Sequence, residues 1–266
     1  KIESDASQWI TYQGKTLKCN APYYWKVKID TNKGATNWSV PAFWITGLFN
    51  EADWQGQWIG LDRAAPGDSE TRWSRLAARY LRKEFAVKKS VKRATVHIAG
   101  MGLYELFING QRIGNQVLAP APTDYRKTIL YNTYDVTSLL QTENAIGVTL
   151  GNGRFYTMRQ NYKPYKIPTF GYPKLRLNLI VEYADGSKET IATNTSWKLI
   201  TEGPIRSNNE YDGEEYDARK ELGAWTQTGY DDKNWMPAQR VSIPSGTLRA
   251  QMMPGMKVTE TLKPVS

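Results

Sequence analysis

The stretch from Gly102 to Tyr156 alternates short apolar segments with tight-turn residues, and it constrains the fold more than any other part of the chain. Residues 105–108 alternate between two faces and run into Asn109-Gly110. This dipeptide tolerates a positive φ at both central positions of a turn. Arg112-Ile113-Gly114 then begins a return segment, so the pattern predicts a β-hairpin.

The second half of the same stretch predicts more strands. Residues 134–140 combine a strand end, an Asx turn at Asp135 and a leucine pair that anchors the turn in the core. Residues 144–150 read as a strand that leads into Gly151-Asn152-Gly153. These glycines lack the spacing of a phosphate-binding loop and have no helical pattern behind them, so we expect no nucleotide site there.

The rest of the chain has the same character. Apolar and polar residues alternate over 94–98 and 175–183, and the second run continues through a turn at 184–187 into another strand over 188–193. No segment shows helical periodicity over three turns, although short helical turns are expected at 50–54 and 230–235. Many short strands separated by turn residues predict an all-β sandwich.

Three pieces of sequence in one order resemble a known family. FING(3)GN(2)LAP, TDY(5)YNTYDVTSLL and NAIGVTLGNGRFY resemble the N-terminal β-sandwich region of bacterial α-L-rhamnosidases, glycoside hydrolase family 78. The flanks at 21–60, 210–239 and 258–266 extend the resemblance over nearly the whole chain. It implies a fibronectin-III/immunoglobulin-like sandwich followed by a larger jelly-roll β-sandwich of galactose-binding-like type.

This resemblance also implies boundaries. Residues 1–53 are expected to form the fibronectin-III-like module, and residues 54–248 the jelly-roll sandwich. Residues 249–266 are expected to be a linker, without a partner strand, toward a catalytic region that this sequence does not contain.

The activity that the resemblance implies is inverting hydrolysis of terminal α-L-rhamnose in plant glycans or glycosides. Such hydrolysis needs a general acid and a general base roughly 6.5–9.5 Å apart. In the family these carboxylates sit in an (α/α)6 barrel, and a chain of strands offers no such barrel. We therefore assign no catalytic residue and expect the chain to be inactive alone, a structural support and carbohydrate-binding module with the catalytic domain as its partner.

A sugar site is expected in the loop over 152–165, NGRFYTMRQNYKPY. Aromatic faces cover the apolar side of a pyranose, while amides and guanidinium groups bond its hydroxyls. Asn152, Arg154 and Tyr156 are the residues predicted to do so. The alternative is that these aromatics pack an interdomain contact, and the sequence leaves both open.

Some relatives use this sandwich as a calcium-dependent rhamnose-binding module, and the positions that match their ligands are Asn115 and Gln116. Where the family commonly has Gly-Asp, this chain has Gly114-Asn115, which removes the anionic oxygen that calcium favours. The family's frequent Pro-x-Trp-Thr is also altered, to Pro120-Ala121-Pro122-Thr123. We therefore assign no metal ligand, although an amide oxygen can still coordinate calcium.

Other candidates for chemistry are weaker. Acidic residues gather at 210–217, but their spacing suits a solvated surface better than an acid and base pair. His97, the only histidine, alternates with apolar neighbours and is expected on a sheet face rather than as a base. Cys19 is the only cysteine, which excludes an internal disulfide.

A formal net charge of +9 leaves polyanion binding open as an alternative function. A further alternative is a purely interdomain scaffold without a sugar site. The basic cluster on which this alternative depends is Arg154, Arg159, Lys163 and Lys166, but no nucleic-acid module is present and we expect no nucleic-acid partner. Apolar runs are too short to span a bilayer. The resemblance implies a secreted or periplasmic protein.

Overall fold

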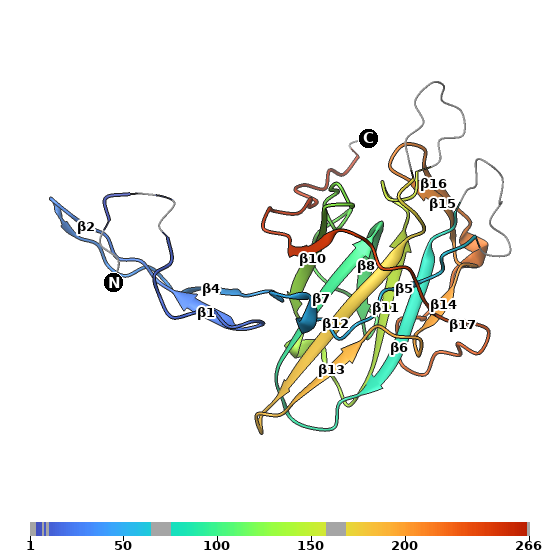
Figure 1. Cartoon of the computed structure of the whole chain (residues 1–266), viewed down its shortest axis with the longest axis horizontal. Helices are drawn as coiled ribbons and strands as arrows, with labels where there is room; N and C mark the ends of the chain where they lie inside the picture. The colour runs from blue at the N-terminus through green and yellow to red at the C-terminus, as the bar shows by residue number, and fades with distance from the viewer. Residues whose placement is uncertain (1–3, 7, 9–10, 65–75, 158–168, 265–266) are drawn as a thin grey trace. The chain divides into compact units, whose positions relative to one another are not determined.

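The computed structural model describes residues 4–6, 8, 11–64, 76–157 and 169–264. The chain divides into two compact units, Lys1–Phe49 and Asn50–Ser266 (Figure 1). Each unit is described by itself.

The first unit is built on short antiparallel pairs. Strand β1 (Pro22–Trp25) pairs with β4 (Ala42–Ile45), and β2 (Asp30–Thr31) pairs with β3 (Gly34–Ala35). The buried Thr46 hydroxyl donates to the carbonyl oxygen of Lys18 at 2.6 Å and accepts from the backbone nitrogen of Ala21 at 2.8 Å. Side-chain hydrogen bonds to the backbone therefore hold the turn before β1 against the end of β4.

The second unit is a sandwich of two sheets. The seven-stranded sheet has the order β18-β5-β12-β7-β10-β19, with β13 also paired to β12. Its strands are β5 (Ile59–Gly60), β7 (Val91–Met101), β10 (Thr128–Asp135), β12 (Lys174–Tyr183), β13 (Lys188–Ala192), β18 (Gln239–Arg240) and β19 (Thr247–Ala250).

The six-stranded sheet has the order β17-β14-β6-β11-β8-β9. Its strands are β6 (Arg79–Ala86), β8 (Leu103–Ile108), β9 (Gln111–Arg112), β11 (Glu143–Gly151), β14 (Lys198–Ile200) and β17 (Met236–Pro237). A separate hairpin joins β15 (Ile205–Asn209) to β16 (Gly213–Tyr216).

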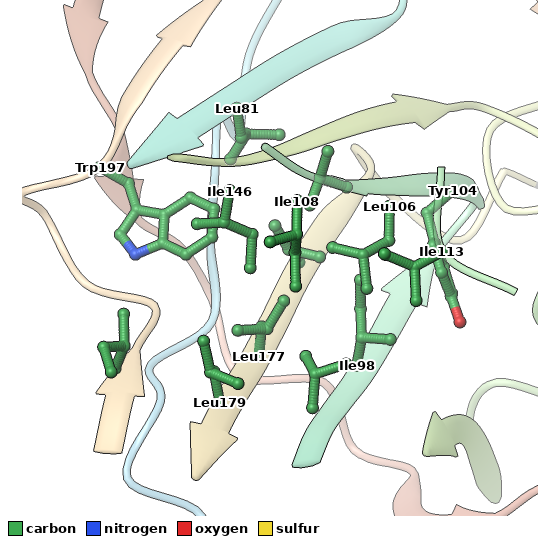
Figure 2. Packing of buried hydrophobic residues seen from close by; sticks show 14 of the residues in the cluster. Leu81, Ile98, Tyr104, Leu106, Ile108, Ile113, Ile146, Leu177, Leu179 and Trp197 are labelled. Carbon is green, nitrogen blue, oxygen red and sulfur yellow. The ribbon is translucent and has the colours of Figure 1, made fainter. Parts of the chain in front are cut away.

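The main core lies between these sheets. Figure 2 shows side chains of β6, β8 and β11 facing those of β7 and β12. Alternate residues of β7 and β12 point inward because successive side chains of a strand lie on opposite faces. Trp197 closes this core, fully buried, and its indole nitrogen donates to the carbonyl oxygen of Ala192 at 3.1 Å. The all-β prediction, an immunoglobulin-like module followed by a jelly-roll sandwich, is confirmed.

The predicted turns are also confirmed. Asn109 and Gly110 have φ values of 50° and 83°, and β8 pairs with β9 on either side of them. The Asp135 carboxylate accepts from the backbone nitrogen of Thr137 at 2.9 Å, which is the expected Asx turn. A 3₁₀ helix, η2 (Thr137–Leu139), follows it.

Of the two expected helical turns, the first is confirmed and the second is wrong. A 3₁₀ helix, η1, spans Glu51–Asp53, and a further one, η3, spans Ala218–Lys220. Residues 230–235 contain no helix. A single turn is present, in which the backbone nitrogen of Trp235 donates to the carbonyl oxygen of Asp232 at 3.0 Å, and the Trp235 ring is buried against Trp225, at 5.8 Å between centroids.

The segment that follows η1 runs along the outer face of the seven-stranded sheet. The backbone nitrogen of Gly56 donates to the Asn178 side-chain oxygen at 2.8 Å, and Arg176 Nε donates to the carbonyl oxygen of Gly56 at 2.6 Å. The Arg176 guanidinium also lies over the ring of Trp54, at 5.3 Å. Arg176 also pairs with Glu51, and the Asn178 side-chain nitrogen donates to the carbonyl oxygen of Asp53 at 3.2 Å. Residues 50–53, expected in the first module, therefore belong to the second unit.

The expectation that residues beyond 249 lack a partner strand is wrong. Strand β19 pairs in parallel with β10, with Arg249 opposite Leu130 and Ala250 opposite Tyr131. Further along, the backbone nitrogen of Val117 donates to the carbonyl oxygen of Met256 at 2.9 Å. The edge of β10 offers unpaired backbone groups, and this segment satisfies them.

Candidate functional site

The loop after β11 starts with a buried asparagine. The Asn152 side-chain nitrogen donates to the carbonyl oxygens of Leu76, at 2.6 Å, and of Asn208, at 2.8 Å. Its backbone nitrogen donates to the Asn208 side-chain oxygen at 2.6 Å. The predicted sugar ligand Asn152 is therefore a structural tie between β11 and the β15–β16 hairpin, and its amide nitrogen is committed to the backbone.

Arg154 is an exposed residue of this loop. Its Nε donates to Glu210 Oε2 at 2.8 Å, and its Nη2 donates to the Tyr211 hydroxyl at 3.2 Å. Both partners belong to the turn between β15 and β16. The Tyr211 hydroxyl and the Glu210 carboxylate together raise the pKa of Arg154 above its ordinary value. The three side chains present a guanidinium, a carboxylate and a phenol on one exposed surface.

Tyr156, the third predicted residue of the loop, is buried. Its ring stacks on Tyr172 with 5.5 Å between centroids and packs with Ala64 and Leu76. The neighbouring Phe155 is buried against Tyr125, at 5.2 Å in an edge-to-face arrangement. The aromatics of residues 152–157 thus fill small cores inside the sandwich. Residues 158–165 of the predicted sugar loop, and with them Arg159 and Lys163 of the basic cluster, lie outside the described residues, as does Lys166.

Asn115 and Gln116 follow β9 in a separate loop. Asn115 is exposed, whereas Gln116 lies against the C-terminal segment: it forms a β-bridge with Lys257, and its side-chain oxygen contacts Gly255. Within the part of the chain that the structure describes, no hydrogen bond or ring contact joins this loop to Asn152, Arg154 or Tyr156. The structure therefore places the predicted site residues in two groups.

The Asn115 loop does not suit a calcium ion. The Arg112 guanidinium donates to the carbonyl oxygens of Gly114, at 3.3 Å, and Gln116, at 2.5 Å, so the backbone oxygens around Asn115 are already bonded to a cation. The buried side-chain oxygen of Gln116 has no hydrogen-bond partner among the described residues. One neutral oxygen beside a guanidinium falls far short of the six to eight oxygen ligands, carboxylates among them, that calcium takes.

The acidic residues of 210–217 separate in the structure. Glu210 faces Arg154, while the Asp217 carboxylate accepts hydrogen bonds from Nε and Nη2 of Arg219, at 2.8 Å each. The hydrogen bond from Arg219 lowers the pKa of Asp217 to about 2. A general acid needs the opposite shift, because it must carry a proton at working pH.

Sequence reasoning missed Tyr211 and the pairing of Glu210 with Arg154. The two sides of this pair lie 56 residues apart in the chain, so no local spacing indicates it. Glu210 itself stood out only as one member of an acidic run.

Two family models match the chain. The α-L-rhamnosidase N-terminal domain matches residues 89–260, and the Rha78A-like N-terminal immunoglobulin domain matches residues 1–50. An α-L-rhamnosidase from Formosa agariphila is 38% identical over 99% of this chain and 30% of its own length. This chain belongs to the α-L-rhamnosidases of glycoside hydrolase family 78.

Solved structures of α-L-rhamnosidases give the same result. The enzyme from Dictyoglumus thermophilum superposes with a TM-score of 0.82 at 39% identity, over 97% of this chain and 29% of its own. The enzyme from Aspergillus terreus superposes with a TM-score of 0.83 at 36% identity, over 92% and 28%. The chain thus spans under a third of the length of these rhamnosidases, as their N-terminal region.

Both candidate loops lie within the part of the chain that matches the α-L-rhamnosidase N-terminal domain. Its match covers the Asn115 loop, the Arg154 surface and the C-terminal segment as far as residue 260. The pairing of β19 with β10 is therefore internal to this rhamnosidase domain. Among the described residues no helix is long and apolar enough to cross a membrane.

Proposed function

We propose that this chain is a non-catalytic part of an α-L-rhamnosidase, which supports the region of the enzyme that hydrolyses terminal α-L-rhamnose. The observation that carries the proposal is that the chain matches the N-terminal domain of α-L-rhamnosidases and spans only about 30% of a relative's length. The direction of the carboxyl pKa shifts agrees with it. Every described carboxyl group whose pKa departs from its ordinary value has it lowered: Asp62, Asp124, Glu182, Asp185, Glu202 and Asp217. An inverting hydrolase needs one acid that stays protonated at working pH.

The remaining titratable candidate supports the same proposal. His97 is buried in β7, and burial lowers its pKa to about 4. Its Nδ1 lies 2.9 Å from the Thr133 hydroxyl inside the sheet face that residues 50–57 cover. A histidine without solvent access is unable to exchange a proton with a glycosidic oxygen, so we assign it a packing role.

The test is turnover of an aryl α-L-rhamnoside by the pure 266-residue chain. We expect no release of the aryl group above the buffer rate between pH 4 and pH 8. Release that follows the protein through a final gel-filtration column would overturn the non-catalytic assignment.

A second function is favoured by the Arg154 surface, which we propose as a weak carbohydrate site. The guanidinium, the Glu210 carboxylate and the Tyr211 hydroxyl are exposed together, and planar charged groups of this kind bond vicinal hydroxyls in pairs. Titration with L-rhamnose, followed by NMR, is expected to shift the signals of residues 153, 154, 210 and 211.

The matched variants for this titration are Arg154→Ala and Arg126→Ala. Arg126 is also exposed and also pairs with a carboxylate, Asp124 at 3.3 Å, but it lies on another loop. Loss of the shifts in the first variant alone supports the site, and equal retention in both excludes it. Shifts at Asn115 instead of Arg154 would move the proposed site to the other loop.

The polyanion-binding alternative makes a different prediction. Attraction that rests on net charge weakens steeply with salt. Binding to polygalacturonate and to DNA that is lost together at moderate salt, without any response to L-rhamnose, would favour it over the carbohydrate site. We also propose, from the family alone, that the protein is secreted or periplasmic, which fractionation of its source cells tests.

A further inference from the structure

An exposed apolar patch lies on the C-terminal segment of the sandwich. Met252 is 90% exposed, and Met253, Met256 and Leu118 are each at least half exposed. Leu118 is included because the backbone nitrogen of the preceding residue, Val117, donates to the carbonyl oxygen of Met256. By contrast, Met101 of β7 is 2% exposed. Clustered apolar side chains on a surface usually mark an interaction site, and methionine adapts well to a partner surface.

The backbone that carries these methionines is fixed at its first end. The backbone nitrogen of Gln251 donates to the carbonyl oxygen of Tyr131 at 2.9 Å. The Gln251 side-chain oxygen accepts from the backbone nitrogen of Ala121, at 3.1 Å, and from the side-chain nitrogen of Asn132, at 3.3 Å. This glutamine therefore joins the segment to β10 and to the loop that contains Ala121.

The second end is fixed as well. The backbone nitrogen of Val117 donates to the carbonyl oxygen of Met256, and Gln116 forms a β-bridge with Lys257. The segment 252–256 is thus a short loop tied to the sandwich on both sides (Figure 1, red). Its apolar side chains are exposed by an ordered backbone, and binding to a partner surface would cost little further ordering.

Charge defines the rim of the patch. Arg249 and Lys257 are exposed on either side of the methionines, and no described carboxylate pairs with either of them. A partner surface that suits this arrangement is apolar at its centre and acidic at its edge, because buried apolar area supplies affinity and rim charges supply orientation.

The lengths of the relatives indicate which part of the enzyme could supply such a partner surface. The chain matches about 30% of the Formosa agariphila enzyme, so most of that polypeptide lies outside the matched region. The loop is the last part of this chain with described hydrogen bonds to the sandwich, and residues 258–264 lead away from it with Val258 and Leu262 exposed. Since the matched domain is the N-terminal one of these enzymes, the remainder belongs to the same polypeptide there, and a surface tethered in this way meets a docking patch at high effective concentration.

We propose that the patch of Leu118, Met252, Met253 and Met256 is the surface on which the C-terminal remainder of the same α-L-rhamnosidase polypeptide docks. The proposal rests on the proposed function, in which this chain is one part of a longer hydrolase. It adds the place of contact and the chemistry of the docking partner.

Methionine oxidation tests the proposal without any substitution. The 266-residue chain and the complete polypeptide that its gene encodes are each treated with dilute hydrogen peroxide, and sulfoxide at each methionine is followed by peptide mass spectrometry. We expect Met252 to be oxidised at least about tenfold more slowly in the complete polypeptide. Met101 is the internal control and is expected to react slowly in both.

Three outcomes overturn the docking proposal. They are equal oxidation of Met252 in both proteins, slow oxidation in the short chain caused by self-association, and a coding sequence that ends at Ser266. None of them bears on turnover of the aryl rhamnoside. Conversely, protection of Met252 together with turnover by the short chain would overturn the non-catalytic assignment and leave the docking surface standing.

A pair of variants gives a second readout. Met252→Ser with Met256→Ser is expected to leave the melting temperature of the short chain unchanged and to lower that of the complete polypeptide by several degrees. Ile243→Ser is the matched control, since Ile243 is 72% exposed and lies outside the patch. Equal effects of both changes on the complete polypeptide would contradict the proposal.

Discussion

The two units of this chain use large apolar side chains in different ways. In residues 50–266 such side chains lie between two sheets, and Trp197 is wholly buried among them. In residues 1–49, Trp25 and Phe43 of the β1–β4 pair are more than half exposed. Two packed layers are needed to remove such side chains from water, and a two-stranded pair alone is marginally stable. Hydrophobic burial therefore stabilises the sandwich, whereas hydrogen bonds and ring stacking stabilise the first unit.

The largest expected effect is at the core of the sandwich. Trp197→Ala is expected to lower the free energy of unfolding by about 3–5 kcal/mol, because the cavity left in a close-packed core is only partly refilled. The measurement is urea denaturation followed by circular dichroism, and Trp38→Ala, at an exposed position of the first unit, is the control. A loss below about 1 kcal/mol would contradict the role given to the core.

The second prediction concerns pH. The folded pKa of His97 is about 4 and its ordinary value is 6.5, because burial disfavours the charged ring. The unfolded chain therefore takes up the proton first, so stability is complete above pH 6.5 and is lost as the pH falls toward 4. The loss over this window is about 3 kcal/mol, from about 1.4 kcal/mol per unit of pKa difference.

Denaturation at a series of pH values, with His97→Gln as the comparison, checks this prediction. The variant lacks the only histidine, so its stability is expected to stay level between pH 6.5 and 5. The same slope in both proteins would assign the loss to carboxyl groups instead of His97.

A smaller effect is expected at the hydrogen bonds of the first unit. Thr46→Val keeps the shape of the side chain and removes the hydroxyl that bonds Lys18 and Ala21. The loss of local stability is expected to be about 1–3 kcal/mol, since two backbone groups lose their partner. Exchange of the Ala21 amide, followed by NMR, is the measurement. If that exchange is unchanged, hydrogen bonding does not hold this unit together.

The smallest effect is expected at the ring pair of β1 and β4. The rings of Tyr23 and Trp44 stack with 4.9 Å between centroids, and Trp44 remains 38% exposed. Trp44→Ala is expected to cost about 1 kcal/mol, measured by the same amide exchange at Tyr23. A cost equal to that of Trp197→Ala would mean that the first unit has a buried core after all, and it would remove the contrast between the units.

Local chemistry made much of the fold predictable. Asn109-Gly110 accepts the positive φ values that the β8–β9 hairpin needs, and Asp135 bonds the backbone two residues ahead. The strict alternation of β7 and β12 places their apolar side chains on one face, which requires a second sheet to cover them. In each case the decisive interaction lies within a few residues or within one strand period.

The candidate site was predicted less well because its side chains are satisfied by distant partners. The residue types that bond sugars also bond the protein backbone, and only tertiary contacts decide between the two. The amide nitrogen of Asn152 donates to the carbonyl oxygens of Leu76 and Asn208, and the ring of Tyr156 stacks on Tyr172. Arg154 alone among the three remains at the surface, because its partners Glu210 and Tyr211 lie on an exposed turn.

By itself, the sequence determined the all-β class, the positions of the main hairpins and the resemblance to the α-L-rhamnosidases, since these follow from periodicity, turn chemistry and ordered motifs. The tertiary structure alone decided that residues 247–251 pair with the edge of β10. It alone also decided that residues 50–57 lie on the outer face of the same sheet, against β12. The physical reason is that the hydrogen-bonding groups of a sheet edge or a polar sheet face are paired by whichever segment the fold brings to them. No local sequence pattern in that segment indicates this pairing.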